Sequence, residues 1–377
     1  MHLRIGYISP TDPFVDKRAW SGTYFNIRKA IEDAGFEVEW IPSEASGALH
    51  GFWMTVCKVL HRILVGNGKF GNSKMSMRIR SRYVNRQKLD KFDLIFAPGQ
   101  SDVVAGINTS VPIVRYSDCT AGLMVDYYWV GWSKKALSEA DYIEREAIRK
   151  ASINLLSSKW AADSVINDYG AAKENVFVIP FGANIDDDRV VKASPFEGGR
   201  LNLLFSGVDW ERKGGQIAVD AAKKLVAEGY DVRLFICGIS DLDPNVSNLD
   251  FVENLGFLSK NVPKEYQKYL DVWSKTHLLI LPTRAECSAI VYNEALAYGV
   301  PVITTDTGGG ADYVINDVTG YRMKLDDGGD AYAAKIAEWI EGRRFELLSQ
   351  EAVKLYNGSN SWKAWSKRFR TIVDDLQ

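Results

Sequence analysis

Apolar and polar positions along the chain follow two alternating periods, which predict strands followed by helices. Short apolar runs rich in Ile, Val and Leu are typical of buried strands, and apolar residues three or four positions apart are typical of helices. In the first half we expect a helix over 24–34 and strands over 4–9, 37–41, 94–97, 111–115, 153–157 and 176–179. This order indicates β-α-β units on a parallel sheet.

The pattern stops at residues 193–199, Ala-Ser-Pro-Phe-Glu-Gly-Gly, and then starts again. A stretch that contains Pro and Gly and has no apolar period is typical of a linker. Beyond it we expect helices over 216–227 and 263–274 and strands over 201–206, 232–237, 278–281 and 300–304. We therefore predict an N-terminal domain over 1–192 and a C-terminal domain over 200–358.

The segment 361–377 carries Trp362, Trp365 and Phe369 at helical spacing. This spacing predicts an amphipathic helix, which we expect to pack back on the N-terminal domain. The expected fold class is α/β, with two Rossmann-like domains facing each other across a cleft. Ligands of such sheets bind outside the carboxyl ends of the strands, so we expect the active site in that cleft.

Composition and charge narrow the class of protein. The chain has 377 residues, of which 46% are hydrophobic and 25% charged, and this excludes a disordered protein. The net charge of -2 and the lack of a zinc-finger or basic-zipper pattern argue against nucleic acid as a partner. The four cysteines are too scattered for a disulfide framework, so we expect reduced, mostly buried thiols at Cys57, Cys119, Cys237 and Cys287.

The first ten residues are typical of a strand rather than of an export signal. The apolar stretch 51–66 is interrupted by Lys58, His61 and Arg62, whereas a membrane-spanning helix requires about 18 or more apolar residues. We therefore expect a cytoplasmic protein. The alternative is a cytoplasmic protein that also contacts the inner face of a membrane.

The segment 281–303 is the strongest candidate site, because a strand, a polar turn, a helix and another strand follow one another in it. We expect the helix to begin near Ser288. The positive end of a helix can hold a diphosphate through backbone amides, here those of Cys287, Ser288, Ala289 and Ile290.

Two carboxylates flank this anion site. Glu286 precedes the helix, and Glu294 is expected about two turns into it. One carboxylate can address the sugar end of a ligand and the other its ribose end. The alternative is a pair of ordinary helix-face glutamates, because Glu residues eight positions apart are common by chance.

A second candidate site follows the strand 201–206, where Gly207 precedes two adjacent cations, Arg212 and Lys213. Cations in this place can neutralise the charge that develops on a leaving diphosphate. The alternative is a solvated pair of side chains that caps a loop.

The segment 281–303 resembles the Glu-x7-Glu region of retaining family-four glycosyltransferases, which have the GT-B fold. In that family the first Glu contacts hydroxyls of the donor sugar, the second contacts the ribose, and the amides between them meet the phosphates. The resemblance implies these roles for Glu286 and Glu294. The chain departs from the family where Val208 follows Gly207 in place of an arginine, and where Arg212 stands beside Lys213.

Two segments of the N-terminal domain can complete the site. The loop 16–23 contains Gly22, which matches the family's glycine loop and could let backbone reach the donor phosphate or the acceptor. Asp118 follows the strand 111–115, where many relatives have a histidine that this chain lacks. Asp118 could orient or deprotonate an acceptor hydroxyl, and the alternative is that it caps the next helix.

The Gly-rich stretch 306–312 resembles the Gly-Gly loop of the family, with a plain turn as the alternative. Asp-x-Asp triplets occur at 186–188 and 241–243, where we expect exposed turns, so we predict no metal and no cofactor. Residues 48–92 hold ten Lys and Arg residues and one acid, Asp90. A basic amphipathic helix there could contact a membrane, with a solvated basic face as the alternative.

The function expected from the resemblance is a retaining glycosyltransferase. It would move a sugar from a nucleoside diphosphate sugar to a hydroxyl of a saccharide or lipid-linked acceptor, in cell-surface polysaccharide or glycolipid synthesis. The alternative is a non-catalytic relative that binds nucleotide or glycan as a partner subunit. A nucleotide-dependent oxidoreductase ranks last, because no G-x-G-x-x-G follows the first strand.

Overall fold

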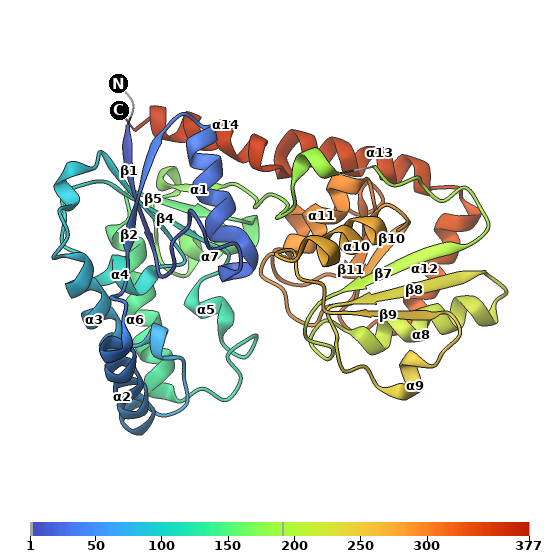
Figure 1. Ribbon diagram of the computed structural model, residues 1–377, viewed down its shortest axis with the longest axis horizontal. Helices are drawn as coiled ribbons and strands as arrows, with labels where there is room; N and C mark the ends of the chain where they lie inside the picture. The colour runs from blue at the N-terminus through green and yellow to red at the C-terminus, as the bar shows by residue number, and fades with distance from the viewer. Residues whose placement is uncertain (1–2, 191, 377) are drawn as a thin grey trace. The chain divides into compact units, whose positions relative to one another are not determined.

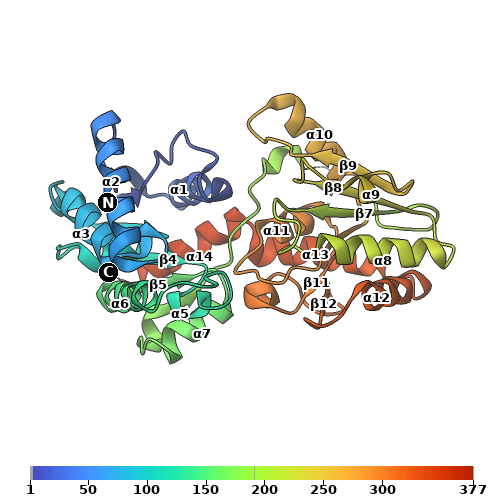
Figure 2. The same cartoon turned by 90° about the horizontal axis from the view of Figure 1, so that it is seen from below.

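The structure, a computed structural model, describes residues 3–190 and 192–376. It consists of two compact units. The first runs to Pro180 and includes the segment from Trp365 onward, and the second is Phe181–Ala364. Each unit has a sheet of its own, with helices packed on it (Figures 1 and 2). The expectation of two Rossmann-like α/β units is confirmed.

Six parallel strands form the sheet of the first unit, in the order β2-β1-β3-β4-β5-β6. The strands are β1 (Arg4–Ser9), β2 (Glu37–Pro42), β3 (Leu94–Pro98), β4 (Ile113–Ser117), β5 (Ile153–Leu156) and β6 (Val176–Val178). The helices are α1 (Thr23–Asp33), α2 (Ala48–Val65), α3 (Lys74–Val84), α4 (Ser101–Gly106), α5 (Ala121–Met124), α6 (Lys134–Lys150) and α7 (Lys159–Asn167), with the short helices η1 (Ala19–Gly22) and η2 (Phe70–Asn72).

Local chemistry explains where these elements form. Every residue of β3 and β4 is buried, as expected of parallel strands that are covered on both faces. The helices α6 and α7 begin where Ser133 and Ser158 accept hydrogen bonds from the backbone N–H three residues later, at 3.1 and 3.3 Å.

The last helix, α14 (Trp362–Asp374), completes the core of the first unit. Trp365 and Phe369 stack on each other at 4.8 Å and contact the ring of Phe96 edge-on. The indole of Trp365 donates to the hydroxyl of Tyr116, which in turn donates to the carbonyl of Ile179. The C-terminal helix expected from the spacing is therefore present.

The sheet of the second unit has six parallel strands in the order β12-β11-β10-β7-β8-β9. The strands are β7 (Leu201–Ser206), β8 (Val232–Cys237), β9 (Val252–Gly256), β10 (Leu278–Leu281), β11 (Val302–Thr305) and β12 (Gly320–Met323). The helices are α8 (Gly215–Ala227), α9 (Pro244–Ser247), α10 (Pro263–Trp273), α11 (Ile290–Tyr298), α12 (Gly329–Glu341) and α13 (Phe345–Leu355), with the short helix η6 (Gly308–Asp312). Helices α8 and α12 lie side by side (Figures 1 and 2).

The change from one unit to the other lies between Pro180 and Phe181, before the stretch 193–199 that we expected to be the linker. The backbone of Phe181 is already bonded within the second unit, to the hydroxyl of Tyr313 and the side-chain amide of Asn293. Within the expected linker, the N–H of Ala193 donates to the carbonyl of Tyr298. These contacts explain why residues from 181 onward pack with the second unit.

Candidate functional site

Strand order places the candidate site of the second unit between β7 and β10. These two strands are neighbours at the centre of the sheet, and the chain runs outward from β7 to β9 on one side and from β10 to β12 on the other. Ligands of open α/β sheets bind at this switch point, outside the carboxyl ends of the strands. The loops 207–214 and 282–289 both begin there. The two candidate sites predicted from the sequence therefore lie side by side.

Backbone contacts join the two loops directly. The carbonyl of Arg212 accepts hydrogen bonds from the N–H of Arg284 at 2.7 Å and from the hydroxyl of Thr283 at 3.2 Å. Gly214 has a left-handed φ of +71°, and a Cβ atom there would lie 2.0 Å from the carbonyl oxygen of Pro282. Only glycine allows this approach, which holds the loop after β7 against the loop after β10.

Lys213 and Glu286 form a buried ion pair between these loops. Only 9% of Lys213 and 7% of Glu286 is exposed. The aliphatic part of Lys213 passes over Gly207, where a Cβ atom would come within 2.9 Å of it. Arg212 Nη1 lies 3.9 Å from the same carboxylate oxygen and donates to the carbonyl of Ala285. Two cations therefore adjoin one buried carboxylate, and Arg212 also pairs with Asp209 at 3.2 Å.

The helix after this cluster, α11, begins at Ile290 rather than near Ser288. Ala289 is its N-cap, with an extended backbone and no side-chain capping bond. Cys287 and Ser288 therefore lie in the loop before the helix, and Cys287 is buried. The first amides of a helix have no partner within it, so this end of α11 has the positive character that favours an anion.

The Gly-rich loop after β11 reaches the same place. The N–H of Gly309, in η6, donates to the carbonyl of Glu286 at 3.3 Å. A Cβ atom at the neighbouring Gly310 would meet no other atom within 4 Å, so space lies beside this glycine.

Glu294 is the fifth residue of α11, little more than one turn from its start, so the expected two turns was wrong. Its carboxylate is buried and held by two side chains that sequence reasoning missed. One oxygen pairs with Lys260, and the other accepts a hydrogen bond from the hydroxyl of Tyr269 at 2.5 Å. Burial, and then the charge of Glu294, raise the pKa of Tyr269 well above its usual value, so that hydroxyl stays a donor. Lys260 also donates to the carbonyl of Asn184.

In the first unit, Gly22 is the N-cap of α1, with φ at +88°. The two residues before it, Trp20 and Ser21, also have left-handed backbone, with φ at +50° and +56°. Such a conformation costs a non-glycine residue about 1–3 kcal/mol and is concentrated at functional sites. The loop between β1 and α1 thus has a strained backbone directly before Gly22, the residue that matches the family's glycine loop.

Asp118 follows β4, at the same carboxyl edge of this sheet. It does not cap the next helix, because Thr120 does so by accepting a hydrogen bond from the N–H of Leu123 at 3.4 Å. The helix-cap alternative for Asp118 is therefore wrong. Its carboxylate accepts a contact from the thiol of Cys119 at 3.6 Å.

Three further predictions from the sequence concern metals, thiols and membrane spans. In the described residues no cluster of three or more His, Cys, Asp or Glu side chains could hold a metal ion. Asp243, of the second triplet, caps α9 by accepting from the N–H of Asn245, and Asp186, of the first, lies 4.0 Å from Arg189. The four cysteines are free thiols, three of them buried, as expected. No helix in the described ranges has the length and apolarity needed to cross a bilayer.

Residues 186–355 match the family model described as "Glycosyl transferases group 1". The chain is 29% identical over 165 residues to a capsular polysaccharide biosynthesis glycosyltransferase of Staphylococcus aureus, covering 43% of this chain and 40% of that protein. It is 23% identical over 321 residues to a putative colanic acid biosynthesis glycosyltransferase of Salmonella typhimurium, covering 80% and 77%. With the first four curated relatives, the match spans about half of their length.

Two solved structures resemble the whole chain in fold. A sucrose-phosphate synthase from Thermosynechococcus elongatus superposes with a TM-score of 0.70 at 16% identity, covering 100% of this chain and 99% of that one. A lipopolysaccharide outer core galactosyltransferase superposes with a TM-score of 0.67 at 13% identity, covering 100% of both chains.

Proposed function

We propose that the protein transfers a sugar from a nucleoside diphosphate sugar to a hydroxyl group of an acceptor. The match of residues 186–355 to the family model described as "Glycosyl transferases group 1" supports this proposal. The observation that carries the proposal is the buried pair of Lys213 and Glu286, which stands at the switch point beside the start of α11. A carboxylate, two cations and a helix N-terminus in one place suit a ligand that joins a sugar to a diphosphate.

In the proposed donor site, the diphosphate lies against the amides of Cys287 to Ile290, with Gly207 allowing close approach. Lys213 and Arg212 neutralise the charge that appears on the diphosphate as its bond to the sugar breaks. Their fixed positive charge supports transfer without a divalent metal. Glu286 hydrogen-bonds hydroxyls of the sugar, and its pairing with Lys213 fixes its position.

Glu294 is proposed to bind the ribose hydroxyls. Its oxygens are already engaged by Lys260 and Tyr269. Binding of ribose therefore requires one of these partners to be exchanged for, or shared with, a ribose hydroxyl. Lys260 is the better candidate for exchange, because 35% of its side chain is exposed whereas Tyr269 is buried.

On the acceptor side, we propose that Asp118 orients the attacking hydroxyl and that the loop at Gly22 contacts the donor phosphate or the acceptor. The new bond forms on the face of the sugar that the diphosphate leaves, so the anomeric configuration is retained. The acceptor proton passes to the leaving phosphate or to Asp118. The names of two relatives refer to the biosynthesis of capsular polysaccharide and of colanic acid, which favours a role in polysaccharide synthesis. We propose a saccharide or lipid-linked acceptor and a place at the cytoplasmic side of the membrane.

The test is a screen of the full chain with uridine, guanosine and adenosine diphosphate sugars, with and without lipid-linked saccharide acceptors. We expect one donor to release its nucleoside diphosphate in an acceptor-dependent reaction, without loss of rate in a metal chelator. Nuclear magnetic resonance of the product gives its anomeric configuration. A protein that binds a donor but neither transfers nor hydrolyses its sugar would be the non-catalytic relative, and the enzyme proposal would fail.

A further inference from the structure

Helix α2 exposes large apolar side chains along most of its length. Its buried residues, Met54, Cys57, His61 and Val65, recur every three or four positions and form the stripe that packs on the first unit. The opposite face exposes Leu49, Phe52, Trp53, Val59, Ile63 and Leu64. At 3.6 residues per turn these six lie on one side of the helix, with Phe52 71% and Ile63 72% exposed. A continuous apolar face of this kind marks an interaction surface.

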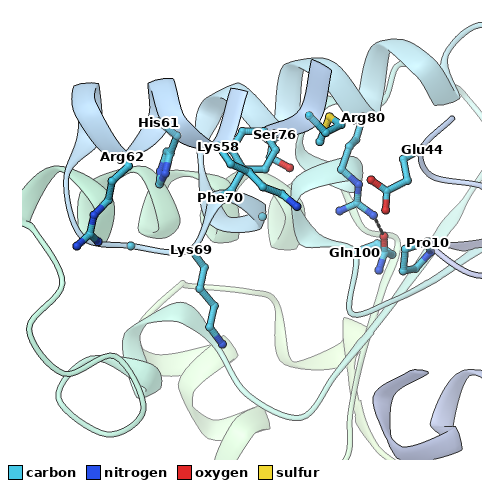
Figure 3. A pocket seen from close by; sticks show the side chains of 13 residues that line it. Pro10, Glu44, Lys58, His61, Arg62, Lys69, Phe70, Ser76, Arg80 and Gln100 are labelled. Atoms are coloured by element: carbon cyan, nitrogen blue, oxygen red, sulfur yellow. Dashed lines mark hydrogen bonds between the residues drawn. The ribbon is translucent and has the colours of Figure 1, made fainter. Parts of the chain in front are cut away.

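A cavity of about 560 Å³ lies beside this helix. Figure 3 shows its lining, in which Lys58 and Arg62 come from α2, Lys69 from the loop before η2, and Arg80 from α3. Glu44 is the one carboxylate among the described lining residues. The cavity therefore gathers positive charge along one flank of α2.

Most of this positive charge is not paired with a carboxylate, and Arg62 donates to the side-chain oxygen of Asn67 at 2.6 Å. The guanidinium of Arg80 is balanced by Asp102, whose two carboxylate oxygens lie 2.8 and 2.7 Å from it. In the described part of the chain, no carboxylate lies within ion-pair distance of Lys58, Arg62 or Lys69. The cavity can therefore accept an anion of the phosphate class.

The position of the cations on α2 distinguishes a bilayer from a protein partner. Lys58 and Arg62 are one turn apart, on the arc between the buried stripe and the exposed apolar face. Lysine is depleted from the cores of protein interfaces. A helix with a basic arc beside an arc of Trp, Phe and Leu is instead typical of helices that lie in the surface of a membrane.

We propose that α2 lies in the surface of an anionic phospholipid bilayer, with its apolar face toward the acyl chains and a lipid phosphate bound in the cavity by Lys58, Arg62 and Lys69. The cavity is also lined by Pro10, Glu44 and Gln100, which follow β1, β2 and β3. Docking therefore brings the bilayer surface to the carboxyl edge of the first sheet. This inference concerns membrane binding alone and does not depend on the transfer reaction.

The test is flotation of the full chain with vesicles of phosphatidylcholine, or of phosphatidylcholine mixed with phosphatidylglycerol. We expect binding to the mixed vesicles that weakens as salt is added, and much weaker binding to phosphatidylcholine alone. Failure of the wild-type protein to bind the mixed vesicles overturns the proposal. So does a dimer in light scattering that the change Phe52→Ser dissociates, because a second copy of the chain would then cover the apolar face.

Two sets of variants separate the apolar face from the phosphate site. Phe52→Ser with Ile63→Ser should weaken binding to both kinds of vesicle by tenfold or more, since two large apolar side chains no longer enter the bilayer. The control is Phe257→Ser, an exposed aromatic residue of the second unit, which should bind as the wild type does. Equal binding by the double variant and the wild type refutes docking through α2.

Lys58→Gln and Lys69→Gln should each weaken binding to mixed vesicles about fivefold, and leave binding to phosphatidylcholine unchanged. The matched control is Lys223→Gln with Lys268→Gln, which removes two exposed lysines of the second unit. An equal loss on both kinds of vesicle, or an equal loss in the control, rules out a phosphate site in the cavity. Circular dichroism verifies that each variant is folded.

Discussion

Removal of either partner of the Lys213–Glu286 pair should destabilise the second unit. Breaking a buried ion pair from one side leaves an uncompensated charge and costs about 3–5 kcal/mol. The side chains here keep 11% and 9% of their surface exposed, and Arg212 lies 3.9 Å from the carboxylate. We therefore expect the lower end of that range, about 3 kcal/mol, for Lys213→Ala and for Glu286→Ala.

A double-mutant cycle measures the pair itself. Urea unfolding of the two single variants, the double variant and the wild type gives the four free energies of unfolding. If the pair acts as a unit, the double variant loses about as much as each single variant, so the coupling energy is about 2–3 kcal/mol. A coupling energy below about 0.5 kcal/mol would refute the reasoning, because the two side chains would then contribute independently.

The same pair gives a prediction for catalysis, which rests on the proposed function. Glu286→Gln keeps the shape of the side chain and removes its charge, and we expect turnover to fall about 100- to 1000-fold, as for other electrostatic groups at a reacting centre. Glu211→Gln, an exposed position in the loop 207–214 that holds Lys213, is the control and should keep its turnover. Near-normal turnover of Glu286→Gln would overturn the role given to Glu286.

Three further predictions follow from single sites. Gly214→Ala should lower the free energy of unfolding by about 2 kcal/mol or more, measured by urea unfolding, because the residue has a φ of +71° and its new Cβ meets Pro282. Burial raises the pKa of Tyr24 to about 12, so the stability that its proton contributes is complete below pH 10 and lost as pH rises from 10 to 12. Tyr24→Phe should flatten that loss in unfolding experiments across this pH range, and an unchanged slope would exclude Tyr24 as its source. Iodoacetamide should modify the partly exposed Cys119 before Cys237, whose pKa burial raises to about 11, and mass spectrometry of the labelled peptides decides the order.

The strands with continuous apolar runs could be located from the sequence. The expected bounds of 4–9, 201–206, 232–237 and 278–281 agree with β1, β7, β8 and β10 residue for residue. Such strands are covered on both faces by crossover helices, so most of their residues are apolar and buried. The edge strands of the second unit, β9 and β12, do not have this pattern. In β9 only Val252 and Leu255 are buried, and in β12 only Gly320 and Met323, so neither strand could be recognised.

Residues that act through distant partners were harder to assign. Lys260 was missed because it follows β9, an unrecognised strand, and a lysine in a loop has no local signal of its own. The alternative role of Asp118 was the N-cap of α5, because Asp is a good N-cap residue. Thr120 is closer to the start of the helix and is its N-cap instead. Lys260 and Thr120 are both visible in the sequence. Their roles depend on which atoms lie beside them in the fold.

Strand order explains why Lys213 and Glu286 meet although 73 positions separate them. The chain moves outward from β7 to β9 and then returns past β7 to place β10 on its other side. That return makes the loops after β7 and β10 neighbours. The first unit does the same, since β1 is followed outward by β2 and β3 then pairs with the other side of β1. In each unit, the loop that follows the first strand therefore lies beside the loop that follows the strand added on its other side. The two loops meet at the carboxyl edge of the sheet. The local sequence pattern identifies these loops as candidates. Their proximity follows only from the order of the strands, which includes the weakly apolar edge strand β9.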